Sequence, residues 1–386
     1  MNSEGSFTPG GSYDVVVVGS GPAGSSAALI LAQNGVSVIL VEKASLPRYK
    51  TCGGGIVGRA LKLLPFSVSQ AIKHYCYTAH LNLVDANLSF SSSRQEPIVA
   101  MTMRDNFDSL LLFATRDAGA IVKSECEVVD IQQQPGSVKL VTTLGTIQAK
   151  FIIAGDGALS TVARKAGWRE TRKLMPAVEY EVFVQENELR RCHHTARFDF
   201  GIVPHGYAWM FPKKEHLSIG VLTTRKNSAN LHHVVKNYLK LLGIVRIPRI
   251  EKHGFVIPMG LRKDGFARNR VLLVGDAAGF VDPVTGEGIT FAILSGQLAA
   301  RAVIEGNFDE QSVRQNYLTT LQERILPELR IASFLSNFLY HPQSRNWLFR
   351  RYGRKFADAV TDVMMGEKTY KHIVSTPRSY LQLIGV

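Results

Sequence analysis

Residues 13–42 predict a strand, a glycine-rich turn, a helix and a second strand, and this order constrains the fold more than any other stretch. Residues 15–18 are four valines, a β-branched run typical of a strand buried on both faces. The segment Gly-Ser-Gly-Pro-Ala-Gly follows at residues 19–24. Residues 25–34 predict a helix that ends at Gly35, and residues 36–41 predict an apolar strand closed by Glu42. We therefore expect a βαβ unit.

The three glycines of this unit have the spacing of a dinucleotide-binding loop. Gly19 permits a tight turn, Gly21 lets the backbone approach a pyrophosphate, and Gly24 lets helix and strand pack closely. The pyrophosphate would lie over the helix N-terminus, where free N–H groups and the helix dipole favour an anion. Glu42 follows Gly24 by 18 residues. Its carboxylate would accept hydrogen bonds from ribose hydroxyls and repel a 2′-phosphate, which favours FAD or NAD over NADP.

Length and charge restrict the class of protein. The 386 residues are enough for two or three domains, and 45% of them are hydrophobic, so a large core is expected. The net charge is +13, but Lys and Arg are spread along the chain and no nucleic-acid-binding pattern is found. We expect no nucleic-acid partner. A soluble basic enzyme and a protein at a membrane surface both remain open, as does the oligomeric state.

Terminal and cysteine patterns indicate the compartment. The first 11 residues are polar without a basic start, so no signal peptide is expected, and no apolar run reaches about 18 residues. Cys52, Cys76, Cys126 and Cys192 show no C-x-x-C spacing, which fits a reducing setting. We expect a cytoplasmic protein without a metal site, with peripheral membrane attachment as the alternative.

Two later segments repeat the transition from strand to turn to helix. Residues 151–154 predict a buried strand that enters Gly155-Asp156-Gly157, and residues 271–274 predict another that enters Gly275-Asp276. A long helix is expected at residues 289–305, and a helix capped by Asp105 begins near residue 104. Further strands are expected within residues 80–90, 120–131, 138–147, 178–184, 197–202, 207–212 and 217–222, and a helix within 230–242.

Together the three glycine segments resemble those of a known class of flavoproteins. Residues 19–42 resemble the adenosine end of an FAD site, and Gly155-Asp156-Gly157 is similar to the middle signature of the glutathione-reductase-like flavoproteins, the class that includes para-hydroxybenzoate hydroxylase. Gly275-Asp276 resembles the third signature. The resemblance implies that Asp276 hydrogen-bonds the ribityl chain and that residues 286–289 bring a helix N-terminus to the flavin N1/C2 edge. Helix N–H groups stabilise the negative charge of a reduced flavin there.

Within this class the chain resembles the geranylgeranyl reductase family. The likeness is carried by Pro47-Arg48-Tyr49-Lys50-Thr51-Cys52-Gly53-Gly54-Gly55, Arg104 with Phe107-Asp108, Tyr207-Ala208-Trp209-Met210-Phe211-Pro212, and residues 275–289. It covers about residues 13–305. It implies an FAD-dependent enzyme that saturates prenyl double bonds in chlorophyll precursors, archaeal lipids or quinones, with a hydride from the flavin and a proton delivered to the other carbon.

The fold class expected from these signals is α/β. It combines a discontinuous Rossmann-like FAD-binding domain, an inserted antiparallel β-sheet substrate domain and a helical C-terminal region. The FAD-binding domain would comprise residues 12–60, 100–168 and 265–305, the substrate domain residues 61–99 and 169–264, and the helical region residues 306–386.

The candidate site residues fall into three groups. Cys52 and Lys50 are the candidate catalytic residues. The cofactor-binding set is Gly19, Gly21, Pro22, Ala23, Gly24, Glu42, Lys43, Cys52, Gly53, Gly54, Arg104, Asp156, Gly275, Asp276, Gly286, Gly288 and Ile289. The substrate-binding set is Tyr207, Trp209, Phe211 and His205.

Several of these assignments leave an alternative open. The resemblance implies that Cys52 lies near the isoalloxazine and assists proton transfer or shapes the pocket, but it would also serve as a small residue in a glycine-rich turn. Lys50 contacts flavin or substrate, or is a solvated charge. Arg104 grips the pyrophosphate, or is a surface arginine at a helix start. His205 donates a proton, or is structural.

The aromatic run and the electron donor also leave alternatives. Tyr207, Trp209 and Phe211 alternate, so on a strand they share one face, which would line a groove for an isoprenoid chain or form sheet core. No second G-x-G-x-x-G follows, so NADPH would visit transiently, or reduced ferredoxin would donate electrons.

Three rival functions remain on the same fold. They are an FAD-dependent monooxygenase, a halogenase and a non-catalytic flavin-bound prenyl-binding protein. Halogenases of this fold carry a Trp-x-Trp-x-Ile-Pro segment, which this sequence lacks. The other two are open, because the FAD signatures define the cofactor rather than the reaction.

Overall fold

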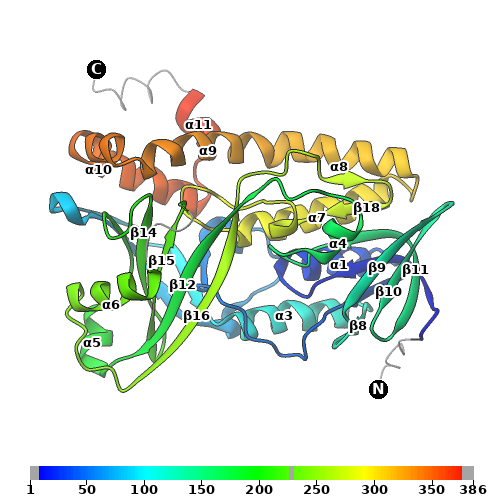
Figure 1. Ribbon diagram of the computed structural model, residues 1–386, viewed down its shortest axis with the longest axis horizontal. Coiled ribbons are helices and arrows are strands. Elements are labelled where there is room, and N and C mark those ends of the chain that lie inside the picture. The colour runs from blue at the N-terminus through cyan, green and yellow to red at the C-terminus, as the bar shows by residue number, and fades with distance from the viewer. Residues whose placement is uncertain (1–7, 226–229, 376–386) are drawn as a thin grey trace. The chain divides into compact units, whose positions relative to one another are not determined.

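The structure, a computed structural model, describes residues 8–225 and 230–375, which divide into two compact units, each discontinuous in sequence (Figure 1). The first unit comprises Met1–Tyr49, Asp105–Lys173 and Pro258–Leu329. The second comprises Lys50–Arg104, Leu174–Ile257 and Arg330–Val386. Residues after 306 are therefore divided between the two units. The expectation of no signal peptide concerns residues 1–11, and the first seven of these lie outside the described residues.

A mostly parallel sheet forms the centre of the first unit. β1 (Ser12–Val18) lies between β2 (Val38–Val41) and β11 (Gly145–Ala154) and is parallel to both. β8 (Ile121–Lys123) continues the sheet beyond β2, and β18 (Val271–Leu273) beyond β11, both in parallel register. The valines of β1 are fully or almost fully buried, as the β-branched run predicts.

The strand β11 is longer than the sequence pattern predicts. Residues 147–150 alternate between buried and exposed positions, and residues 151–154 are all buried. The predicted strand over residues 138–147 is therefore wrong: it breaks after Thr142, and residues 145–147 belong with 151–154 to one strand that runs from an antiparallel hairpin into the covered sheet. β9 (Val128–Gln134) and β10 (Ser137–Thr142) form that hairpin, and β17 (Ala267–Arg268) pairs antiparallel with β18.

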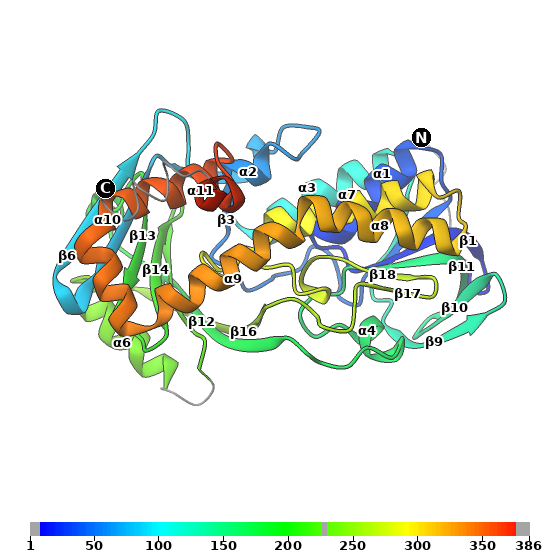
Figure 2. The same ribbon diagram turned by 90° about the horizontal axis from the view of Figure 1, so that it is seen from above.

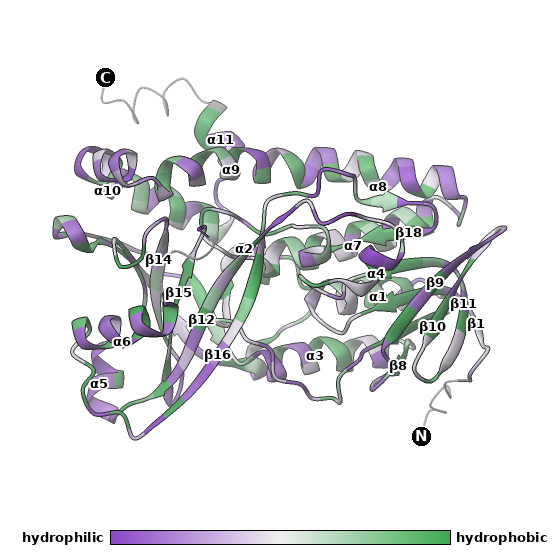
Figure 3. Ribbon diagram, in the orientation of Figure 1, coloured by the Kyte–Doolittle hydropathy of each residue, from purple (hydrophilic) through white to green (hydrophobic). Residues whose placement is uncertain are grey.

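Helices α1 (Pro22–Gln33) and α7 (Ile289–Glu305) pack side by side in the first unit (Figure 1). A Cβ at Gly296 of α7 would lie 2.1 Å from the Ala23 carbonyl oxygen, so only glycine permits this approach. Figure 3 shows that α7 is largely hydrophobic, in agreement with its burial. The other helices of this unit are α3 (Arg104–Asp117), α4 (Thr161–Lys165), α8 (Glu310–Arg324) and the start of α9 (Leu326–Tyr340).

The predicted cap of α3 is wrong. The helix begins at Arg104, so Asp105 lies inside its first turn, where the carboxylate accepts the N–H of Asn106 at 2.7 Å. An acidic side chain in a first turn still complements the helix dipole. Sequence pattern therefore located the helix and its start but assigned the wrong cap.

A seven-stranded sheet dominates the second unit, in the order β16-β12-β15-β14-β13-β5-β6. Its described pairings are antiparallel except for β13 with β5. Its strands are β5 (Thr78–Leu83), β6 (Leu88–Ser93), β12 (Lys173–Phe183), β13 (Thr195–Phe200), β14 (Gly206–Pro212), β15 (His216–Thr223) and β16 (Arg249–Met259). A second sheet contains β3 (Gly55–Val57), β7 (Val99–Thr102) and β4 (Ile72–Cys76).

The two faces of the larger sheet differ in composition. One face packs on α6 (Leu231–Leu241) through Val178, Tyr180, Val182, Ala208, Met210, Leu217, Ile219 and Val221. Because side chains alternate along a strand, their neighbours point to the opposite face. That face carries Glu179, Trp209 and Ser218, which form part of the candidate site described below.

Helix α10 (Pro342–Met365) covers the β5–β6 end of this sheet (Figure 2). A Cβ at Gly353 would lie 2.2 Å from the Phe90 ring, so the helix comes close to the strand at this glycine. Pro342 occupies the first turn, and Gly366, with a φ of +73°, ends the helix in the left-handed conformation. The short helices α2 (Gly58–Leu61), α5 (Glu186–Arg191) and α11 (Tyr370–Ser375) complete the unit. None of the described helices combines the length and apolar character that a bilayer span needs.

Candidate functional site

The predicted dinucleotide loop is built on backbone contacts that exclude side chains. Gly19 has a φ of +97°, and a Cβ there would lie 2.5 Å from the Gly155 carbonyl oxygen. A Cβ at Gly24 would lie 1.9 Å from the Gly19 carbonyl oxygen. The first and second glycine segments are therefore in direct backbone contact, and two of the three loop glycines are required sterically.

The N-terminus of α1 presents the N–H groups that an anion needs. Gly21 is its N-cap and has an extended conformation without a capping side chain. Pro22 has no N–H, and the first intrahelical bond runs from the Ser25 N–H to the Gly21 carbonyl at 2.9 Å. The N–H groups of Ala23 and Gly24 thus lie at the helix end, where the dipole favours a phosphate. The loop fits the pyrophosphate of FAD.

Glu42 is buried at the end of β2 and accepts several hydrogen bonds. Its Oε2 accepts the N–H of Ser20 at 2.9 Å, the hydroxyl of Ser20 at 2.8 Å and the Nε–H of Arg48 at 3.3 Å. Its Oε1 accepts the Ala44 N–H at 3.1 Å. Burial raises the pKa of Glu42, but Arg48 and these hydrogen bonds outweigh it, and the net pKa lies below its usual value. The predicted ribose contact would fall on Oε1, which has fewer partners. Lys43 beside it is exposed.

Arg48 links this carboxylate to a second acid. Its Nη2 lies 3.4 Å from Oδ2 of Asp108, a buried residue of α3, while its Nε binds Glu42. The Pro47-Arg48 and Phe107-Asp108 segments, both singled out in the sequence, therefore meet at one ion-pair cluster. No sequence pattern pairs Arg48 with Asp108, because they are 60 residues apart.

The middle glycine segment positions Asp156 at a helix start. The Asp156 carboxylate accepts the Ser160 hydroxyl at 2.6 Å and the Val162 N–H at 3.0 Å, so it satisfies the N-terminus of α4. Burial raises the pKa of this carboxyl despite those hydrogen bonds. The structure thus gives Asp156 a capping role in addition to the predicted cofactor role.

Two buried arginines, which sequence reasoning missed, hold the third glycine segment in place. Arg172 donates to the carbonyls of Asp276, Ala277 and Ala158, the last two at 3.3 and 2.7 Å. Arg262 donates to the Ala277 carbonyl at 2.7 Å. Gly275 has a φ of +55°. The turn that carries Asp276 is therefore fixed to the segment that carries Asp156. A basic residue in a loop gives no sequence signal for such a contact.

The start of α7 has its own acidic partner. Gly288 is the N-cap and Ile289 the first helical residue, and Gly286 has a φ of +71°. The Glu287 carboxylate accepts the Thr290 N–H at 2.6 Å. One N–H of this N-terminus is thus already occupied by an anion, and the flavin contact predicted for residues 286–289 would use the others.

In the second unit, the glycine loop that contains Cys52 lies on the face of the large sheet opposite α6. The Cys52 N–H donates to Oε2 of buried Glu179 at 2.9 Å, and the Gly54 N–H donates to the Cys52 sulfur at 3.4 Å. Oε1 of Glu179 accepts the Ser218 hydroxyl, whose oxygen accepts the Trp209 Nε1–H at 3.3 Å. A Cβ at Gly53 would lie 3.0 Å from the Phe211 ring. The loop and the aromatic strand therefore form one assembly.

Lys213 also supports the Cys52 loop, a role that the sequence did not predict. Its buried ammonium donates to the carbonyls of Gly53 and Thr102, both at 2.6 Å. Burial lowers the pKa of Lys213, and the negative charge of Glu179 opposes that shift. Burial and the charge of Lys213 lower the pKa of neighbouring His216 to about 4. No sequence pattern distinguishes buried Lys213 from its exposed neighbour Lys214.

The predicted substrate residues form a row of aromatic rings. The ring centroids of Tyr207 and Trp209 are 6.2 Å apart, and those of Trp209 and Phe211 are 6.4 Å apart. They lie on the face that does not pack on α6, so the row is not part of the core around that helix. At the other end, Tyr207 stacks on Tyr340 with ring centroids 6.4 Å apart.

The remaining candidates lie at the edges of this assembly. The Lys50 ammonium lies 3.7 Å from the centroid of the Phe255 ring. His205 has a φ of +53° in the turn before β14, and its ring lies 6.3 Å from that of His341. Burial and nearby positive charges lower the pKa of His205. Arg104 is the first residue of α3.

These features define a flavoprotein. The chain matches the family described as FAD binding domain over residues 12–305 and belongs to it. Within that class it belongs to the geranylgeranyl reductase family. It is 31% identical over 321 residues to digeranylgeranylglycerophospholipid reductase 2 of Methanothermobacter thermautotrophicus, which covers 77% of this chain and 80% of the relative. It is 30% identical over 354 residues to the menaquinone reductase of Mycolicibacterium smegmatis, which covers 86% and 85%.

Solved structures share the fold. A geranylgeranyl bacteriochlorophyll reductase-like protein of Thermoplasma acidophilum superposes with a TM-score of 0.77 at 23% identity and covers 97% of this chain and 96% of its own. A flavin-dependent brominase gives a TM-score of 0.74 at 19% identity and covers 92% and 94%. The predicted α/β fold class is confirmed. At these identities the likeness concerns the fold and not the reaction.

We expect Asp276→Ala to weaken FAD binding by roughly ten- to a hundredfold. A hydrogen bond to a charged group contributes about 1.5–3 kcal/mol, and the variant removes the one predicted for the ribityl chain. Equilibrium titration of apoprotein with FAD measures the loss. Asp117→Ala, at an exposed position of α3 in the same unit, is the control. Equal FAD affinity of the two variants would show that Asp276 does not bind the ribityl chain.

We expect Lys213→Met to lower the free energy of unfolding by about 1–3 kcal/mol, because it leaves the Gly53 and Thr102 carbonyls without a donor. Lys214→Met, which changes the exposed neighbour, should stay within about 0.5 kcal/mol of the wild type. Denaturant titration of the FAD-loaded proteins measures both values. Equal stabilities would contradict the supporting role of Lys213.

Proposed function

We propose that this protein is an FAD-dependent reductase that saturates carbon–carbon double bonds of a prenyl chain carried by a lipid, a quinone or a chlorophyll precursor. The observation that carries the proposal is the assembly of the Cys52 loop with the aromatic row of β14. It combines a largely buried row of aromatic rings, a lining suited to isoprenoids, with a thiol at one end. The relatives named as prenyl or quinone reductases support this reading.

Cys52 has the surroundings of a proton donor. When bound and reduced by the electron donor, FAD would supply a hydride to the alkene. Proton delivery to the second carbon then falls to the protein, since an unactivated alkene is a poor hydride acceptor. The Gly54 N–H points at the Cys52 sulfur, and the charge of Lys213 interacts with Cys52. The hydrogen bond from Gly54 holds the sulfur within the loop that packs against Phe211.

The aromatic row would bind the prenyl chain by apolar contact. Tyr207 and Trp209 are almost fully buried, and Phe211 lies against Gly53 of the loop. The polar Glu179–Ser218 pair fixes the Trp209 ring through its Nε1–H. A rigid ring loses little conformational entropy on binding and excludes water from the alkene.

The reductase reading is distinguished from its rivals by one anaerobic experiment. The flavin is reduced, and a geranylgeranyl lipid or quinone is added while the absorbance of oxidised flavin is followed. The proposal predicts return of the oxidised spectrum together with a saturated product. A monooxygenase would reoxidise only when O₂ is admitted, and a prenyl-binding protein would not reoxidise with the alkene. Reduction by NADPH and by reduced ferredoxin in parallel reactions identifies the electron donor.

The enzyme would meet its substrate at a membrane surface. Phe334 of α9 and Trp347 of α10 are 73% and 52% exposed, and the rings of Phe338 and Trp347 lie 5.9 Å apart. Arg350, Arg351 and Arg354 are exposed and follow Trp347 at helical spacing on α10, whose mixed hydropathy is visible in Figure 3. Exposed aromatic rings beside basic residues suit the headgroup region of an anionic bilayer.

Cys52→Ala should retain FAD but slow reoxidation of the reduced flavin by the alkene. General acid–base catalysis contributes about 10²–10⁴-fold, so even partial involvement would be visible in single-turnover kinetics. Cys192→Ala is the control, because its sulfur lies 3.7 Å from Met210 Sδ beside the core around α6. If Cys52→Ala reoxidises at the wild-type rate, the cysteine only fills the turn.

Trp209→Ala should weaken binding of long prenyl chains more than short ones. It deletes apolar contact area, and at about 25 cal/mol per Å² the loss approaches a few kcal/mol for a long chain. Met210→Ala lies on the same strand but points to the opposite face, so it should lower stability without discriminating chain length. Dissociation constants for prenyl diphosphates of increasing length test both variants. Parallel losses for all lengths would argue against the groove.

The exposed aromatic residues should anchor the protein to vesicles. Trp347→Ala is expected to reduce partitioning to phosphatidylserine-containing vesicles by about tenfold, because the variant removes about 1–2 kcal/mol of apolar burial. Phe113→Ala, which changes a 68% exposed phenylalanine of α3, is the matched control. Sedimentation with the vesicles measures the partition. Equal partitioning of the two variants, or no preference for the anionic lipid, would refute the membrane surface assigned to α9 and α10.

A further inference from the structure

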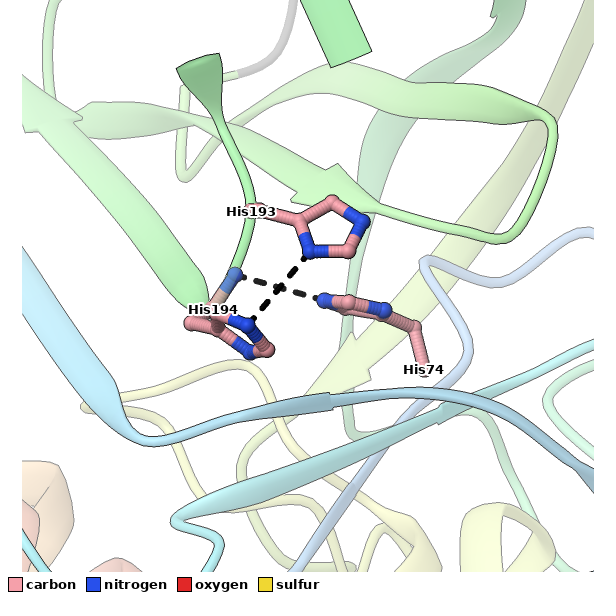
Figure 4. A group of neighbouring side chains, drawn as sticks. All are labelled: His74, His193 and His194. Carbon is pink, nitrogen blue, oxygen red and sulfur yellow. Dashed lines mark hydrogen bonds between the residues drawn. The ribbon is translucent and has the colours of Figure 1, made fainter. Parts of the chain in front are cut away.

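Three histidines of the second unit come together away from the Cys52 loop. His74 lies on β4, and His193 and His194 lie in the turn between α5 and β13 (Figure 4). His74 precedes His193 by 119 residues and His194 by 120 residues. We propose that these three imidazoles form a binding site for a divalent transition metal, with Zn²⁺ as the expected occupant.

The spacing of the ring nitrogens suits a tetrahedral metal. One nitrogen of each ring lies within 4.8 Å of one from each of the other two. Nδ1 of His193 and Nε2 of His194 are 3.5 Å apart. Two nitrogens bound tetrahedrally at about 2.0–2.1 Å from Zn²⁺ lie about 3.3 Å from each other. This pair is therefore almost at coordination distance, and small ring rotations would bring in His74.

A second contact selects the tautomer that a metal needs. The Tyr75 carbonyl oxygen lies 3.2 Å from Nδ1 of His194 and accepts a hydrogen bond from its N–H. Nε2 of His194 then carries the lone pair, and this nitrogen faces His193. Metal-binding histidines are commonly oriented in this way by a backbone carbonyl on the other nitrogen.

His74 is already in direct contact with the other two histidines. Nε2 of His74 accepts the His194 N–H at 3.3 Å. Binding through this nitrogen would replace that weak bond by coordination. The three rings also contact one another, with centroids 4.3, 4.8 and 5.3 Å apart.

The ligand set determines the class of ion. Three imidazoles favour Zn²⁺, Ni²⁺ or Cu²⁺ over Mg²⁺ or Ca²⁺, which prefer oxygen ligands. The nearby Cys192 thiol is directed to the Met210 sulfur and does not join the set. Because His193 and His194 are exposed, water would complete the coordination. The bound ion would tie β4 to the turn before β13, where the N–H groups of Tyr77 and Thr78 already donate to the His194 carbonyl.

Metal titration of the intact FAD-loaded protein tests the site. The protein is treated with a chelator, and Zn²⁺ binding is measured by calorimetry while Co²⁺ binding is followed by its visible spectrum. We expect one ion per chain and a Co²⁺ spectrum of tetrahedral type. Loss of a group that only hydrogen-bonds a metal ligand typically lowers metal affinity roughly 10–100-fold. Loss of a ligand should cost at least as much, so His193→Gln and His194→Gln should each weaken Zn²⁺ binding at least about tenfold.

Controls separate this site from adventitious binding. His233→Gln changes an exposed histidine of α6 and should leave Zn²⁺ affinity unchanged. His74→Gln tests the partly buried ligand, and thermal melts show whether each variant is folded. Equal Zn²⁺ affinity of the wild type and the folded His193→Gln and His194→Gln variants would overturn the proposal. The readout is metal affinity, so the result is independent of the reductase function.

Discussion

The first unit depends on the close approach of three backbone segments at Gly19, Gly24 and Gly155. A Cβ at Gly24 would lie 1.9 Å from the Gly19 carbonyl oxygen, and one at Gly19 would lie 2.5 Å from that of Gly155. The obstructing atoms are backbone, so a side chain would force β1, α1 or β11 to move rather than a rotamer to change. The same contact fixes the N-terminus of α1 at the carboxyl ends of two parallel strands, which is where doubly wound sheets bind their ligands.

The second unit meets a different constraint, because its functional loop has few side chains of its own. The three glycines after Cys52 cannot hold a conformation by packing, so groups from the sheet hold them through the loop backbone. Glu179 accepts the Cys52 N–H, and Lys213 donates to the Gly53 carbonyl. Burying both charges is costly, and their mutual attraction and hydrogen bonds offset the cost. Such a cluster favours one arrangement of the loop, because any other would leave a buried charge unpaired.

Sequence patterns predicted what depends on local order. The loop at residues 19–24, the position of Glu42 at the end of β2 and the limits of α7 follow from periodicity and glycine spacing. Glu179 could not be found in this way, because it alternates with Val178 and Tyr180 and an alternating acid predicts a solvent face. The Cys52 loop, 127 residues away, covers that face instead. Arg172 and the three histidines were missed for the same reason, since their partners are set by tertiary register.

The aromatic row of the second unit has different neighbours at its two ends. At one end Phe211 lies against Gly53 of the Cys52 loop, and at the other Tyr207 stacks on Tyr340 of α9. Two residues before Tyr340, Phe338 joins the exposed rings of Phe334 and Trp347 that we assign to the membrane surface. Under the proposed function, the ring contacts from Tyr340 to Tyr207 and Trp209 would form the apolar connection between α9 and the thiol. Apolar contact along this path would replace contact with lipid, so transfer would expose little hydrocarbon to water.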